Sequence, residues 1–232
     1  MKTFITQPTY LPWIGIFKAI EYCDNFVFYD DVQFERKSWQ NRNRILNKSK
    51  GDFLYLTVPV SKQPQKTKIK DIKIANHIFY KDHLKKIKNN YSDTEFLRNV
   101  IFLLESIYSK NYIFLADLTT DLIKEISGYI GIKSNFYHSH NFGITGDIQT
   151  RPLKFAQELK TTEYLTQTGT KEYTNIENYN KCKIEVTFLD FGHPVYRQQR
   201  QLFTPFLSII DLLINVGPNE TREIIRNIKL KK

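Results

Sequence analysis

The 232-residue sequence is poor in cysteine, glycine and proline, and it has no long apolar run. Cys23 and Cys182 stand far apart and form no C-x-x-C pair, which excludes a disulfide scaffold and a thiolate zinc cluster. Nine glycines and eight prolines exclude a low-complexity or collagen-like chain. No run approaches the roughly 18 uncharged residues that span a bilayer, and residues 1–6 lack a secretory apolar region. We therefore expect a cytoplasmic protein with reduced thiols and no stable membrane insertion.

Acidic residues are scarce in one segment. The whole sequence has 34 Lys and Arg against 24 Asp and Glu, a net charge of +10. Residues 33–88 alone contain 15 basic and 4 acidic residues, so this segment accounts for the whole excess. Such a segment suits nucleic acid, phosphate or anionic lipid. The competing interpretation is compositional bias, because 25 of the 34 basic residues are lysine.

The first thirty residues have the pattern of a βαβ unit. A short strand at 3–6 and a Pro-containing loop precede an amphipathic helix at 13–22. A buried strand at 26–29 then ends at Asp30-Asp31. Residues 33–75 read as a basic β insertion, with strands at 38–46, 53–60 and 69–74.

Helices and single strands follow the insertion. The periodicity predicts helices at 78–90, 94–108 (opening on the capping-box spacing Ser92–Glu95), 113–130, 150–160 and 206–216, and another after Pro218. Strands are predicted at 135–138, 162–165 and 183–189. The fold class is therefore α/β: a single domain over 1–232 with a parallel Rossmann-like sheet, the basic β insertion 33–75 and a helical C-terminal part.

Two groups of candidate residues follow predicted strands. Gln7, Tyr10 and Trp13 belong to the loop between the first strand and the first helix, where open α/β sheets place ligands. The alternative is a Pro-stiffened turn with Trp13 in the core. Asp30 and Asp31 are candidate catalytic acids, with Asp190 at the end of another strand; the alternative for such acids is loop capping.

A third group lies in the insertion. Arginine, asparagine and glutamine alternate there, and the guanidinium fork suits phosphate or carboxylate while amides read polar ligand edges. We expect this segment to bind substrate through Gln40, Asn41, Arg42, Asn43 and Arg44. A weaker turn signal suggests a phosphate-binding cradle at Thr168, Gly169, Thr170 and Lys171.

The histidines are assigned by their neighbours in the sequence. His193 follows Asp190 and is the candidate general acid or base. His83 lies among helix apolar residues and is interpreted as structural. His138 and His140 have no acidic or cysteine residue nearby in the sequence, so no metal site is predicted.

Several strings of this sequence resemble the WbqC-like family of bacterial proteins. They run over nearly the whole chain and include Gln7-Pro-x-Tyr-Leu-Pro-Trp13, Phe28-x-Asp-Asp-Val-Gln-Phe34, Trp39-Gln-Asn-Arg-Asn-Arg-Ile45, Leu56-Thr-Val-Pro-Val60, His193-Pro-Val-Tyr196 and Ser208-Ile-Ile-Asp-Leu-Leu-x-Asn-Val-Gly-Pro218. The resemblance implies a role in O-antigen or other surface-polysaccharide synthesis, with glycine transfer to an amino sugar proposed for one branch. The sequence departs from the family at 166–170 and at Arg197-Gln198.

The opening unit also resembles the nucleotidylyltransferase scaffold. Trp13-Ile14-Gly15-Ile16 stands where that scaffold carries a His-x-Gly-His motif. Both histidines are missing, which argues against the same adenylylation chemistry.

The resulting functional hypothesis is aminoacyl or acyl transfer to a nucleotide-linked amino sugar. Two donor systems remain open: ATP with magnesium, and an aminoacyl-tRNA. The oligomeric state is open as well. Two alternatives remain: a nucleic-acid-binding module that uses the basic residues 33–88, and a non-catalytic partner of a glycan assembly complex.

Overall fold

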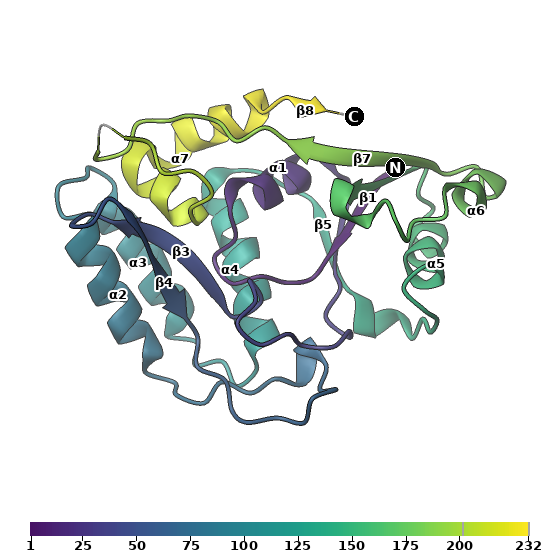
Figure 1. Cartoon of the computed structure of the whole chain (residues 1–232), viewed down its shortest axis with the longest axis horizontal. Coiled ribbons are helices and arrows are strands. Elements are labelled where there is room, and N and C mark those ends of the chain that lie inside the picture. The colour runs from purple at the N-terminus through teal and green to yellow at the C-terminus, as the bar shows by residue number, and fades with distance from the viewer. Residues whose placement is uncertain (201, 232) are drawn as a thin grey trace.

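The computed structural model describes residues 1–200 and 202–231 and is built around a six-stranded sheet (Figure 1). The strand order is β5-β2-β1-β6-β7-β8, and the first five of these strands run parallel. They are β1 (Lys2–Thr6), β2 (Asn25–Phe28), β5 (Asn135–His138), β6 (Glu163–Gln167) and β7 (Glu185–Phe191). The short β8 (Leu230–Lys231) pairs with β7 in the antiparallel direction. The predicted Rossmann-like parallel sheet is confirmed.

Side chains on the central strands alternate between two apolar clusters. Phe4, Phe26 and Phe28 pack into the larger cluster, whereas Ile5 and Val27 point into the smaller one on the opposite face. A sheet that is buried on both faces explains why residues 26–28 of β2 are all apolar.

Helices cover both faces of the sheet (Figure 1). The larger cluster includes residues of α1 (Ile14–Tyr22), α2 (Phe79–Asn90), α3 (Leu97–Tyr108), α4 (Leu115–Ile130) and α7 (Ile209–Asn227). The smaller cluster includes residues of α5 (Thr150–Glu158) and α6 (Ile176–Lys181). No helix in the ranges 1–200 and 202–231 combines the length and the apolar character that crossing a bilayer requires.

The segment after β2 forms a separate two-stranded antiparallel sheet, made of β3 (Arg42–Asn47) and β4 (Asp52–Thr57). The predicted strand at 38–46 is shorter than expected, since residues 38–41 form turns. The strand predicted at 69–74 is wrong at its start. Ile69–Asp71 is a 3-10 turn, η1, and the three-residue spacing of the buried Ile69 and Ile72 fits that geometry.

Two helix termini differ from their predictions. α3 begins at Leu97, and its N-cap Phe96 makes no side-chain hydrogen bond, so the predicted capping box does not form. α7 begins at Ile209, where the Ser208 side chain accepts a hydrogen bond from the Ile210 N–H. The predicted interruption at Gly217 is present, because this residue adopts a φ of 76° and breaks α7 into two helical parts.

A chain of hydrogen bonds runs through the larger cluster to His83 on α2. The Nε2 of His83 lies 3.1 Å from the carbonyl oxygen of Thr57, so a neutral imidazole donates there. The other nitrogen then accepts from the hydroxyl of Tyr10 at 2.8 Å, and Tyr10 in turn accepts from Tyr108 at 2.5 Å. Tyr10, Tyr108 and His83 are buried, and His83 is only 2% exposed, whereas Thr57 at the end of the chain is exposed.

This network predicts acid sensitivity. Burial disfavours the imidazolium form and lowers the pKa of His83 from 6.5 to about 4. The unfolded chain therefore binds a proton that the folded chain does not, and folding stability falls as the pH drops from about 6.5 to about 4. We expect this group to remove about 3 kcal/mol of stability between pH 7 and pH 4.

The measurement is urea unfolding of the wild-type protein and of His83→Gln at both pH values. The other acid-sensitive groups are common to both proteins, so the stability difference between them isolates His83. We expect that difference to shrink by about 3 kcal/mol at the lower pH. Parallel pH profiles would contradict the assignment.

Candidate functional site

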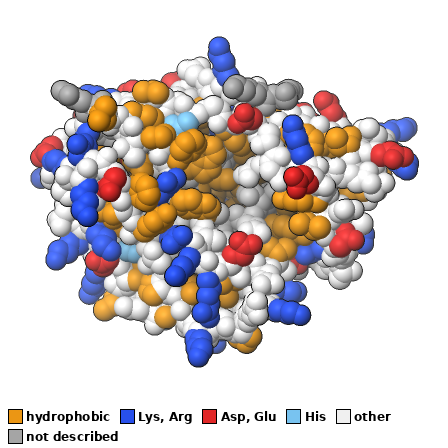
Figure 2. Space-filling view, in the orientation of Figure 1, with side chains coloured by type: hydrophobic (Ala, Val, Ile, Leu, Met, Phe, Trp, Pro, Cys, Tyr) orange, Lys and Arg blue, Asp and Glu red, His pale blue; other side chains and the backbone are white. Residues whose placement is uncertain are grey.

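A cavity of about 760 Å³ lies at the carboxyl ends of β1 and β6. β1 pairs with β2 on one side and with β6 on the other, so the chain reverses its winding here. Open α/β sheets bind ligands at such a switch point. Figure 2 shows the hollow in this face of the molecule, with hydrophobic side chains along its rim. The predicted site residues that line the cavity are Gln7, Trp13, Gln40, Asn43, Arg44, Thr168, Gly169 and Thr170.

Two glutamines join the loop after β1 to the insertion. The Nε2 of Gln40 donates to the Oε1 of Gln7 at 2.7 Å, and the Gln40 Oε1 accepts from the Glu35 N–H at 3.0 Å. Gln40 is only 2% exposed, so its amide is fixed by these bonds. The pair holds the Gln7 side chain in the cavity wall.

Asn43 fixes the backbone of the loop that carries Tyr10. Its Nδ2 donates to the carbonyl oxygens of Tyr10 at 3.1 Å and of Leu11 at 2.9 Å. Leu11 has a φ of 42°, a conformation that non-glycine residues seldom adopt. The Asn43 amide therefore stabilises an unfavourable backbone turn at the cavity, and its donors are already used.

Arg44 places its guanidinium between aromatic rings. It lies 5.0 Å from the ring centre of Trp39 and 4.7 Å from that of Phe53, and it donates to the carbonyl oxygen of Phe206 at 3.3 Å. Its Nε is buried and has no hydrogen-bond partner within 1–200 and 202–231. A buried N–H without a partner costs free energy that a ligand oxygen would recover.

Trp13 lies over the start of α1. Its ring stacks on His193 and packs against Phe191 and Phe206. A Cβ on Gly15 would fall inside van der Waals contact with the Trp13 indole. Glycine at this position therefore allows the indole to lie flat on the helix and reach the cavity.

His193 uses both ring nitrogens within the fold. Its Nδ1 lies 2.8 Å from the Pro194 carbonyl oxygen, and its Nε2 accepts from the Phe206 N–H at 2.9 Å. Burial lowers its pKa and favours the neutral ring that these two bonds require. This predicted acid or base is thus placed as a support for Trp13, outside the cavity lining.

Four other predicted substrate-binding and phosphate-binding residues also lie outside the lining. Tyr10 is buried in the hydrogen-bond chain to His83, and the Asn41 amide donates to the Val58 carbonyl oxygen at 3.0 Å. Arg42 lies over the Tyr55 ring at 4.4 Å, and Lys171 lies over the Phe188 ring at 5.3 Å.

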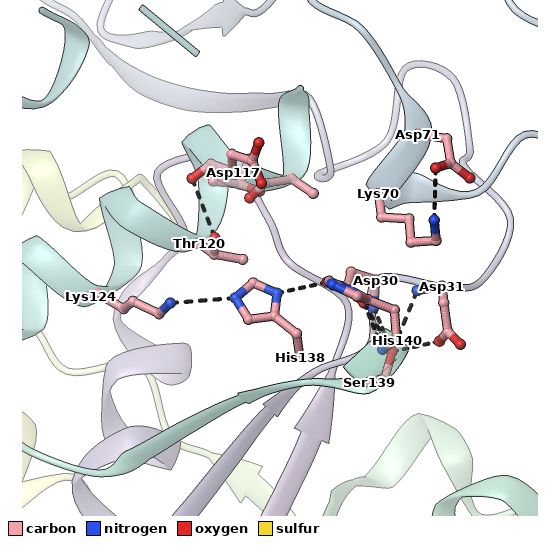
Figure 3. A network of polar contacts seen from close by, with 12 residues as sticks. Asp30, Asp31, Lys70, Asp71, Asp117, Thr120, Lys124, His138, Ser139 and His140 are labelled. Carbon is pink, nitrogen blue, oxygen red and sulfur yellow. Dashed lines mark hydrogen bonds and ion pairs between the residues drawn. The ribbon is translucent and has the colours of Figure 1, made fainter. Parts of the chain in front are cut away.

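Asp30 and Asp31 follow β2 and enter a polar network beside the cavity (Figure 3). Asp31 pairs with Arg151 at 2.5 Å, and both it and Asp30 accept from the Ser139 hydroxyl. The fully buried carboxylate of Asp30 also accepts from the Nδ1 atoms of His138 and His140. Burial alone would raise the pKa of Asp30, but the two imidazoles outweigh it and hold that pKa below its ordinary value.

The expectation that His138 and His140 lack an acidic partner is therefore wrong. β5 pairs with β2 in parallel, with Phe28 opposite His138, so the residues that follow the two strands meet at one edge of the sheet. Sequence distance concealed this partner, because Asp30 and His138 lie 108 positions apart along the chain.

The sequence analysis did not identify some of the cavity residues. Tyr29, Glu35 and Tyr173 are such residues. Asp190, which the sequence did indicate as an acid at a strand end, also lines the cavity, near the end of β7. Tyr29 is the last residue of the predicted strand at 26–29, and that position was the available signal. Glu35 is placed by the insertion, whose path over the sheet no local pattern indicates.

The turn after β6 is organised by threonine hydroxyls. η3 (Thr168–Thr170) follows the strand directly, and the hydroxyls of Thr166 and Thr170 lie 2.9 Å apart. Thr170 also donates to the Gln167 carbonyl oxygen at 2.8 Å. The turn offers short polar side chains to the cavity.

The contact between Gly15 and Trp13 predicts opposite effects for two Gly→Ala substitutions within helices. Gly128 lies on the exposed side of α4, and an added Cβ there meets nothing within 4 Å, so Gly128→Ala should stabilise the protein by about 1 kcal/mol. Gly15→Ala should destabilise it by about 1–3 kcal/mol, because the methyl group displaces the indole. Urea unfolding measures both, and equal stabilisation by the two variants would contradict the packing.

Comparisons with known proteins agree over most of the chain. The model of the WbqC-like protein family matches residues 7–223. A Mycobacterium tuberculosis protein described as "Uncharacterized protein Rv1507c" is 31% identical over 219 residues, which cover 93% of this chain and 94% of that protein. No solved structure matches the chain.

Proposed function

Since the chain belongs to the WbqC-like protein family, we propose that it transfers an aminoacyl or acyl group, glycyl foremost, to a nucleotide-linked amino sugar. The reaction would serve bacterial surface-glycan synthesis. The observation that carries this proposal is the cavity at the switch point, which combines a half-buried arginine, fixed amides and aromatic rings.

The cavity has the size and the chemistry for a sugar nucleotide. Its volume of about 760 Å³ falls within the range of small-molecule sites. The Arg44 guanidinium, with its unpartnered buried Nε, is suited to a phosphate oxygen of the diphosphate. Trp13 and Tyr29 offer aromatic faces to a base or sugar ring, and the Gln7 amide offers hydrogen bonds to sugar hydroxyls.

Transfer requires the sugar amine to attack an activated carbonyl carbon. A C–N bond forms, the C–O bond to the donor breaks, and the ammonium proton passes to a base. Glu35 and Asp190 are carboxylates in the cavity lining and are our candidates for this base. The earlier candidates Asp30, Asp31 and His193 lie outside that lining, so we assign them no direct contact with the amine.

The direct test incubates the protein with UDP- and dTDP-amino sugars, glycine and ATP with magnesium, or with glycyl-tRNA. Mass spectrometry should detect a sugar nucleotide heavier by one glycyl residue. Absence of any acylated product across these donors and acceptors would contradict the proposed reaction.

Arg44→Gln should lower kcat/KM for the sugar nucleotide by roughly 10–100-fold, as expected for the loss of a charge-assisted hydrogen bond to phosphate. Arg98→Gln is the matched control, because Arg98 is exposed on α3 outside the cavity lining. An equal effect of both substitutions would point to general charge rather than to a bound phosphate.

The two donors make different demands on the basic segment. Arg42 and Tyr55 on β3–β4, with Trp39 in the turn before β3, form a partly exposed row of arginine and aromatic side chains, a surface suited to stacking unpaired bases. If glycyl-tRNA is the donor, product formation should fall steeply with added salt. If ATP and glycine are used, salt should have little effect on the rate.

A further inference from the structure

Asp30, His138 and His140 place three potential metal ligands around one point. The Oδ2 of Asp30 lies 2.7 Å from the Nδ1 of His138 and 2.9 Å from the Nδ1 of His140. Each of the three residues offers one ligand atom, and these atoms lie within 4.8 Å of one another. Figure 3 shows the imidazoles directed toward the carboxylate, from the end of β5 and from η2 (Ser139–Phe142).

These distances fit ligands that share a metal ion. Metal–nitrogen bonds to imidazole are roughly 2.0–2.1 Å long, so ligand atoms at right angles around one ion lie about 3 Å apart. The separations from Asp30 to the two histidines are close to that value. Without an ion, one carboxylate oxygen must accept from two imidazoles at once.

The carboxylate is held in the orientation that such a site requires. The hydroxyl of Ser139 donates to Oδ1 of Asp30 at 3.1 Å, which leaves Oδ2 directed at the histidines. Supporting hydrogen bonds of this kind orient the ligands of metal sites in general. Asp30 is fully buried, whereas His140 is 37% exposed, so the cluster is anchored on one side and accessible to solvent on the other.

The surrounding charges also favour a cation. Two nearby cations are already paired, Lys70 with Asp71 at 2.8 Å and Arg151 with Asp31 at 2.5 Å. The carboxylate of Asp117, on α4, lies in the same region (Figure 3).

Lys124 also contacts the cluster. Its Nζ lies 3.4 Å from the Nε2 of His138. Metal binding through Nδ1 leaves the ring proton on Nε2, so the ammonium must then turn away. Asp121 is three residues earlier on α4 and already interacts electrostatically with Lys124. Its carboxylate is an alternative partner for the ammonium.

We propose that Asp30, His138 and His140 bind a divalent transition metal through Oδ2 and the two Nδ1 atoms. Two imidazoles and one carboxylate suit Zn²⁺, Fe²⁺ or Co²⁺ and disfavour Mg²⁺ and Ca²⁺, which take oxygen ligands. The site adjoins the cavity through Tyr29, which lines the cavity and precedes Asp30 in the chain. Metal binding here does not depend on the proposed transfer reaction.

The test uses the full-length protein after removal of metals with a chelator. Calorimetric titration with Zn²⁺ should give one site per chain, and Mg²⁺ should give no comparable binding. Cobalt provides the residue-level readout. In the Co²⁺ protein, paramagnetically shifted NMR spectra should show two exchangeable imidazole N–H signals, one from each histidine ligand.

His140→Gln should weaken Zn²⁺ binding by more than the roughly 10–100-fold that loss of a supporting group costs, and should remove one of the shifted signals. His77→Gln is the matched control, since His77 is exposed and outside the cluster. Circular dichroism of both variants without metal verifies that the fold is intact. Equal Zn²⁺ affinity in wild type and His140→Gln, or no binding by the wild type, would show that the three residues form only a hydrogen-bond network.

Discussion

The parallel pairing of β1 with β2 on one side and β6 on the other constrains the rest of the structure. The chain leaves β1 toward β2 on one side of that strand and later returns to β6 on its other side. The two connections therefore separate at the carboxyl end of β1, and the cavity lies there. The same parallel arrangement, extended to β5, brings the residues after β2 against those after β5. The cavity and the Asp30 cluster are thus neighbouring consequences of one sheet topology.

The insertion between β2 and β5 completes the cavity. The insertion, residues 33–75, contributes Glu35, Gln40, Asn43 and Arg44 to the lining. Arg44 is the one basic residue of the charged segment 33–88 among the lining residues. The excess positive charge therefore lies mostly on other surfaces. For a bound phosphate, a partly desolvated guanidinium matters more than the sum of exposed lysines, because solvent and salt screen the latter.

Local sequence pattern was sufficient for most of the elements and for the class of fold. Apolar runs marked the buried strands, and three- and four-residue periodicity marked α2, α4 and the two parts of α7. The pattern failed where long-range contacts decide the conformation. The isoleucines at 69–74 read as a strand, but their side chains are buried from a 3-10 turn followed by extended backbone.

The candidate site was predictable by segment, but only in part by residue. The loop 7–13 and the string 39–45 both reach the cavity, yet Gln7 lines it while Tyr10 is buried against His83. Similarly, Asn43 lines the cavity while Asn41 bonds to Val58. No local pattern reports a positive φ at leucine or the path of the insertion over the sheet. The partnership of Asp30 with His138 and His140 required the pairing of β2 with β5.

The hydrogen-bond chain from Tyr108 through Tyr10 to His83 has a consequence for ligand binding. Each tyrosine hydroxyl donates to the next residue of the chain, and His83 donates to Thr57, so all the hydrogen bonds point the same way. The chain joins α3, α2, β4 and the loop after β1. Asn43 restrains the same loop through its carbonyl groups. The backbone beside the cavity is therefore already ordered in the folded protein. A ligand that binds there would lose little free energy to ordering this wall of the cavity.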